Sequence, residues 1–91
     1  MNIYLVKRRE GSCGWEEYEA FVCVAENEEE ARKFCPQKEA AWNDELGIFV
    51  LADSVFEAQE WPVTIQELKV TYLGQAQEGR ESGIVLSSFY G

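Results

Sequence analysis

Carboxylates are the side chains most available for chemistry in this sequence. Asp and Glu number 17 among 91 residues, and four Glu fall within the five positions 26 to 30 of "AENEEEARKFCP". Carboxylates can move protons, hold divalent cations or present negative charge to a partner. Asp44 and Glu45 are adjacent and would point apart on a helix, and no D-x-D-x-D-G calcium loop occurs. We therefore expect no catalytic residue, no metal site and no enzymatic activity.

The His and Cys content further limits the reactions and metal sites that this chain could support. The sequence has no His, which excludes Ser-His and Cys-His catalysis within the chain. Cys13, Cys23 and Cys35 lie at spacings of ten and twelve, which fit neither a disulfide framework nor a C-x-x-C metal knuckle. We expect free thiols, with Cys23 and Cys35 in the core and an exposed Cys13 that lacks a base to activate it.

The acids of the "NEEE" segment have a local structural explanation. Asn27 is a good N-cap, and Glu30 follows at the spacing of a capping box. Glu28, Glu29 and Glu30 would fill the first turn, where the helix dipole favours negative charge. Ala31, Phe34 and Cys35 supply an apolar stripe and Pro36 ends the helix.

Charge is distributed unevenly along the chain. The net charge is −9, made of +3 over residues 1 to 9, −12 over residues 10 to 67 and zero over residues 68 to 91. An acidic middle repels nucleic acid and anionic membranes and attracts basic surfaces. No apolar run approaches the roughly 18 residues of a membrane span, and the start "MNIYLVKRRE" lacks the order of an export signal. We expect a cytoplasmic protein that binds neither membrane nor nucleic acid.

The pattern of apolar residues predicts one domain, residues 1–91, of the α+β class. Strands are expected over 2 to 8, over "EEYEAFVCVA" and over 48 to 52, then over 68 to 74 and 84 to 90. The first two would form a hairpin and the last two a second hairpin. The result is a small antiparallel sheet of four to five strands in β-β-α-β-β order, with one or two helices packed on one face. The first strand would be an edge that Lys7, Arg8 and Arg9 protect.

The middle of the chain is less regular. Residues 37 to 47 could form a short helix with Trp42 and Leu46 inward and Gly47 as its C-cap. Residues 53 to 62 read as a helical turn or an irregular loop, with Trp61 as a core side chain. Thr64 and Glu67 have capping-box spacing around a single turn.

Three segments resemble a loose group of small, mostly uncharacterised phage and prophage proteins. They are the "IYLV" strand with its "EYEAFVCVAENEEEAR" continuation, the "W" of "EWPVTIQELKVTYLGQA", and the closing "GIVLSSF". Residues 36 to 60 take no part. The resemblance carries over no active-site residue, but it implies an accessory phage protein in a bacterial host. Such proteins are often inhibitors of host defence, including anti-CRISPR and anti-restriction proteins.

The hypothesis that follows is an inhibitor that binds a host nucleic-acid-handling complex. Carboxylates on a rigid fold can act as a DNA mimic and occupy a basic groove, because duplex DNA carries a charge about every 1.7 Å. Trp residues beside them would be anchors, since aromatic residues dominate interface hot spots. The predicted partner-binding residues are Glu16, Glu17, Glu19, Asp44, Glu45, Glu57, Glu60, Trp15 and Trp42.

Three alternatives stay open at this point. The acids could be a solvated face that keeps the protein soluble. The chain could instead be a phage structural or regulatory protein–protein interaction module, including one that dimerises through a sheet edge. It could also bind a small ligand such as a nucleotide signal through Arg8, Arg9 and Arg80, although it has no Gly-rich phosphate loop and we expect no cofactor.

Overall fold

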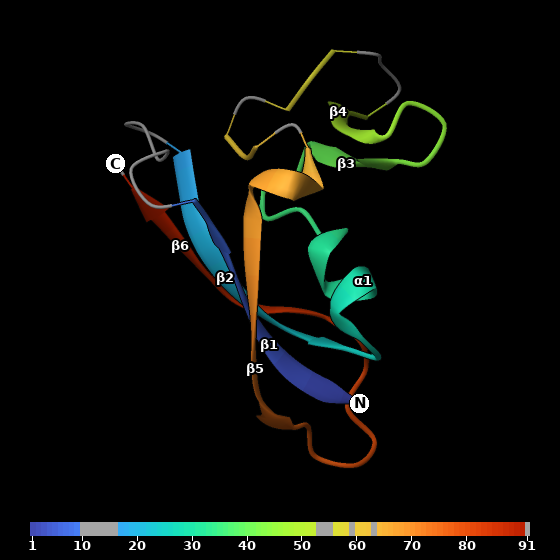
Figure 1. The fold of residues 1–91 in the computed structure, drawn as a ribbon, viewed down its shortest axis with the longest axis vertical. Coiled ribbons are helices and arrows are strands. Elements are labelled where there is room, and N and C mark those ends of the chain that lie inside the picture. The colour runs from blue at the N-terminus through green and yellow to red at the C-terminus, as the bar shows by residue number, and fades with distance from the viewer. Residues whose placement is uncertain (10–16, 53–55, 59, 63, 91) are drawn as a thin grey trace.

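The computed structural model describes residues 1–9, 17–52, 56–58, 60–62 and 64–90. Within these residues lie six strands, one α-helix and one 3-10 turn (Figure 1). In chain order they are β1 (Asn2–Arg8), β2 (Glu17–Ala25), α1 (Glu28–Arg32), β3 (Ala40–Asn43), β4 (Ile48–Leu51), η1 (Ile65–Glu67), β5 (Leu68–Gln75) and β6 (Gly83–Tyr90). The strand positions expected from the sequence are confirmed, with β3 added.

Four of the strands form one antiparallel sheet in the order β5-β1-β2-β6. β1 pairs with β2 on one side, where Val6 lies opposite Phe21, and with β5 on the other, where Val6 lies opposite Val70. The expectation that the first strand is an edge is therefore wrong. Its residues alternate between two faces that are both largely apolar, as is typical of a central strand.

The predicted second hairpin is also wrong. β5 and β6 are consecutive in the chain, yet they lie at opposite edges of the sheet. The segment between them passes the N-terminus, where the Ala76 N–H donates to the Met1 carbonyl at 3.0 Å. The turn residues of 76 to 82 predict a reversal of the chain but not which strand each arm will pair with.

Residues 37 to 47 form no helix, which corrects a further expectation. β3 and β4 pair as a two-stranded hairpin, with Trp42 opposite Phe49. Asn43 closes the turn, because its carbonyl accepts from the Gly47 N–H at 2.8 Å and its side chain accepts from the Leu46 N–H at 3.0 Å. Gly47 has φ of 68° and supplies the left-handed residue of this turn rather than a helix C-cap.

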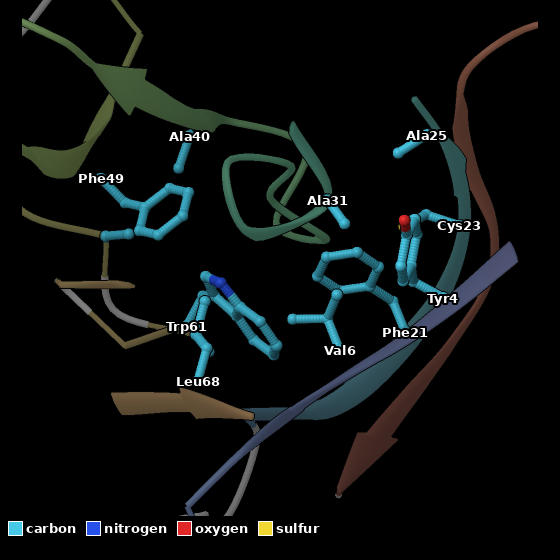
Figure 2. Close-up of a cluster of buried hydrophobic side chains, with 11 residues drawn as sticks. Tyr4, Val6, Phe21, Cys23, Ala25, Ala31, Ala40, Phe49, Trp61 and Leu68 are labelled. Atoms are coloured by element: carbon cyan, nitrogen blue, oxygen red, sulfur yellow. The ribbon is translucent and has the colours of Figure 1, made fainter. Parts of the chain in front are cut away.

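The α+β class is likewise overturned: the described chain is mostly antiparallel strand, with very little helix packed on it. α1 has five residues, and Ala31 is its one buried side chain. A helix this short cannot cover a sheet, so strand and loop side chains fill the core instead. Figure 2 shows Trp61 between Phe49 of the hairpin and Val6 of the sheet. The Trp61 ring lies 5.3 Å from the Phe21 ring, centroid to centroid, which confirms Trp61 as a core residue.

Candidate functional site

The described residues contain no group of three or more Cys, Asp or Glu placed to hold a metal ion. Burial raises the pKa of the Cys23 thiol to about 11, with a further contribution from Glu30. Burial also raises the pKa of Cys35 to about 11, although a backbone hydrogen bond with Gln37 opposes the shift. Both thiols are protonated near neutral pH and are poor nucleophiles.

The predicted acids at the start of β2 have basic neighbours. Arg8 is 8% exposed, and its Nη1 donates to Glu17 Oε1 at 3.2 Å and to the Tyr18 carbonyl at 3.2 Å. Glu19 Oε1 lies 4.0 Å from Lys7 Nζ. Glu17 is thus part of a partly buried ion pair that closes one end of the sheet, not a free carboxylate facing solvent.

Two other predicted residues lie in the β3–β4 hairpin, Trp42 on β3 and Asp44 in the turn. The Trp42 Nε1–H donates to Asp44 Oδ1 at 2.8 Å, while the Trp42 ring packs edge-on against Phe49. Lys33 Nζ lies 3.4 Å from Glu29 Oε1 and 3.9 Å from Asp44 Oδ1. This lysine brings the first turn of α1 and the hairpin turn together.

The exposed acids of α1 and of the β3–β4 turn form what we call the acidic surface. It consists of Glu28, Glu29, Asp44 and Glu45. The side chains of Glu28, Glu29 and Asp44 are 58%, 78% and 84% exposed, and Glu45 is exposed as well. Two of these four residues, Glu28 and Glu29, were explained from the sequence by helix capping and not assigned to a partner.

The remaining predicted residues are scattered. Glu57 is exposed beside β4, where it bridges to Val50. Glu60 is half-buried, and its carbonyl accepts from the Tyr18 N–H at 2.8 Å, far from the hairpin turn in the chain. Trp15 and Glu16 lie outside the described residues. The structure therefore divides the predicted set between the start of β2, the hairpin turn and the flank of β4.

The sequence reading missed a second surface, on the face of the four-stranded sheet that turns away from α1 and the hairpin. Tyr4 and Val6 point into the core, so the alternating Leu5 points the other way, with Val22 opposite it on β2 and Leu86 opposite Val22 on β6. These side chains line a shallow hollow of about 330 Å³. We call this the open face, made of Leu5, Ala20, Val22, Leu86 and Ser88.

The open face is strongly exposed on its β6 side. Leu86 is 68% exposed and the neighbouring Val85 is 52% exposed. At the other end of the sheet Val24 is only 2% exposed. The segment that contains Ala76, Gln77 and Arg80 lies beside Val24 and Ile3 and covers this end of the face. A signal for this face existed in the sequence, since "EAFVCVA" is apolar on both of its alternating faces.

The same geometry separates the basic residues suggested for a small ligand. Arg8 lies at the last position of β1, whereas Arg80 lies near Ile3, at the beginning of that strand. Five residues of extended strand span about 16 Å. Arg8 and Arg80 therefore do not converge on one anion.

No helix among the described residues is long and apolar enough to cross a membrane. Comparisons with protein-family models, with curated protein sequences and with solved structures found no match.

Proposed function

We propose that this chain is a non-catalytic protein–protein interaction module whose open face is covered by a protein partner. The observation that carries the proposal is the exposure of Leu86 and Val85 beside the half-buried Leu5 and Val22 on a sheet face. Contiguous exposed apolar surface on a soluble domain marks an interaction site more often than an isolated exposed Leu does. The partner that fits it presents an apolar surface and an extended strand, because the open face ends at a sheet edge.

Site-directed photo-crosslinking tests this proposal. A photo-reactive amino acid replaces Ser88, which is exposed on the open face, and in a matched protein it replaces Gln66, which is exposed on η1. We expect protein adducts from position 88, in purified protein or in bacterial lysate, and none of comparable yield from position 66. Equal adduct yields from the two positions, or none from position 88, would contradict the proposal.

A second candidate function is the inhibition of a host nucleic-acid-handling complex by carboxylate mimicry, in the phage context that the sequence resemblance implies. The observation that favours it is the contact of Lys33 with both Glu29 and Asp44, which gathers acids from two elements on one surface. A basic groove evolved for phosphates would attract such a surface strongly at low salt.

The test of the second candidate is the salt dependence of partner capture. Binding through the acidic surface should be strong at about 100 mM salt and largely lost at about 500 mM. The double variant Asp44→Asn/Glu45→Gln should weaken capture, whereas Glu78→Gln/Glu81→Gln, with the same change of charge on the β5–β6 connection, should not. A partner that is indifferent both to salt and to Asp44→Asn/Glu45→Gln would exclude mimicry at this surface.

A further inference from the structure

β6 is an edge strand with an unusual composition. It runs from Gly83 to Tyr90 as "GIVLSSFY", which contains no charged residue and no proline. The opposite edge, β5, carries Lys69. Natural edges are commonly protected by charges, prolines or bulges, because unpaired N–H and C=O groups otherwise recruit another strand. The pairing of β6 with β2 shifts register between Ile84 and Leu86 and again between Ser88 and Phe89, so Leu86–Ser88 is the part of this edge strand in unbroken register.

We propose that the partner of the open face is a second copy of this chain, which pairs antiparallel with β6 across a two-fold axis. This inference rests on the proposed interaction function and names its partner. The two four-stranded sheets would join into one eight-stranded sheet, and the two open faces would become continuous beside the axis. A two-fold interface needs one patch that is complementary to itself, and an antiparallel strand pair meets that condition.

The distribution of charge favours this surface for self-association. Each chain carries −9, so two copies repel each other wherever their acids face. The acidic surface lies on α1 and the β3–β4 turn, on the other side of the sheet from the open face. The acids of β2 nearest the open face, Glu17 and Glu19, lie beside Arg8 and Lys7. The uncharged β6 edge therefore lets two copies meet with little direct repulsion between carboxylates.

The exposed apolar side chains of β6 are of the kind that an interface covers. Leu86 is 68% exposed and Val85 is 52% exposed. A stable interface of standard size buries about 800 Å² on each partner. Contact between two open faces beside the paired β6 strands would cover both side chains.

Sedimentation velocity over about 5 to 200 µM protein tests the inference, because a dimer dissociates on dilution. The wild-type mass should rise from 10.4 kDa toward twice that value. Leu86→Lys and Ser88→Lys should remain at 10.4 kDa across the range, because each places two lysines beside the axis. Leu73→Lys is the matched control. Leu73 is a 53% exposed leucine on the β5 edge, so it makes the same change of charge at the other edge and should associate like the wild type.

The design separates local from general effects. Every one of these substitutions lowers the net negative charge of the chain, so general electrostatics alone would favour association in all of them. Leu86 and Ser88 are exposed, and circular dichroism with thermal unfolding should match the wild type. Loss of the dimer in Leu86→Lys and Ser88→Lys, but not in Leu73→Lys, would locate the contact at β6.

Other outcomes of these experiments would overturn the inference. They also show whether the proposed interaction function fails with it. A wild-type chain at 10.4 kDa over the whole range excludes the second copy as partner. If position 88 then crosslinks to a different protein, the interaction function survives with another occupant. If position 88 crosslinks to nothing, both proposals fail. Association that Leu73→Lys abolishes and Leu86→Lys does not would place the dimer at the β5 edge and also overturn the inference.

Discussion

Arg8, at the end of β1, is a buried positively charged residue. Its guanidinium is held by the Glu17 carboxylate and by the Tyr18 carbonyl, both at 3.2 Å. This contact links the last residue of β1 to the first residues of β2. Glu17 therefore contributes to the stability of the fold, and exchanging it for lysine would report on stability as well as on partner binding.

Breaking this pair from either side should lower the stability. Arg8→Ala leaves Glu17 half-buried without its Arg8 partner and should lower the free energy of unfolding by about 2–4 kcal/mol. Glu17→Gln keeps a side-chain acceptor but leaves the more deeply buried Arg8 charge without this carboxylate, so it should cost a similar amount. Urea denaturation of the two variants measures both values. Equal small losses would show that the pair contributes no more than an exposed surface ion pair.

Trp61 is the largest fully buried side chain, and its Nε1–H has no hydrogen-bond partner in the part of the chain that the structure describes. Trp61→Ala should cost about 3–5 kcal/mol, since it opens a large cavity between the sheet and the hairpin. Trp61→Phe keeps a ring and removes the unsatisfied donor, so we expect it to cost less than half as much. Urea midpoints test the ranking, and similar losses for Phe and Ala would mean that the Trp61 N–H has a partner after all.

The buried thiols give the fold a pH dependence at the alkaline end. The folded-state pKa of Cys23 and of Cys35 is raised from 9.0 to about 11. A raised pKa means that the folded state binds the proton more tightly, so this stability is complete below pH 9.0 and is lost as the pH rises through about 11. Between about pH 8 and pH 10.5 the wild type should lose more free energy of unfolding than Cys23→Ala/Cys35→Ala does. The two proteins differ only at these two positions, and an equal loss in both would remove the thiols as the cause.

At the scale of elements, side-chain hydrogen bonds at the N-terminus of the short helix α1 stabilise it. Asn27 Oδ1 accepts from the Glu30 N–H at 2.9 Å, and Glu30 Oε1 accepts from the Glu26 N–H at 3.1 Å. Asn27→Ala should cost about 1 kcal/mol, and Asn27→Asp, which keeps the acceptor, should be nearly neutral. Urea denaturation with unchanged m-values would measure this. A loss as large for Asp as for Ala would show that the side-chain cap does not stabilise the helix.

The same elements show how far local sequence patterns extend. The cap at Asn27 and the bounds of β1 were readable because they depend on residues a few positions apart. The β3–β4 hairpin was not, because Trp42 and Leu46 also fit a helical stripe. The decision for strand depends on Phe49, which Trp42 meets across the hairpin. Thr64 shows the converse case, since η1 forms as expected while the Thr64 side chain makes no capping bond.

Sheet order was the least predictable feature, and the open face could not be predicted without it. Alternation in "GIVLSSF" predicts a strand but not its neighbour, and β6 pairs with β2 rather than with β5. Only that placement puts Leu86 beside Val22 and Leu5 and creates the open face. The acids could be counted from the sequence, yet the ion pair of Glu17 with Arg8 and the Lys33 contacts required tertiary structure.

At the scale of the whole molecule, the two sides of the four-stranded sheet differ in chemistry. One side bears α1, the hairpin and the acidic surface, and the other bears the uncharged open face that continues to the β6 edge. A dimer through β6 would leave both acidic surfaces free. Self-association and acidic binding are therefore compatible, and they should respond to salt in opposite directions.

Raising the salt concentration should strengthen the dimer. Two chains of −9 each repel at long range, and salt screens that repulsion while apolar contact and strand pairing are little affected. From about 50 to about 500 mM NaCl we expect the dissociation constant from sedimentation to fall several-fold. Leu86→Lys should stay monomeric at every salt concentration, which separates screening of a real contact from salting-out. If the dimer instead weakens with salt, ion pairs and not the β6 edge hold the two copies together.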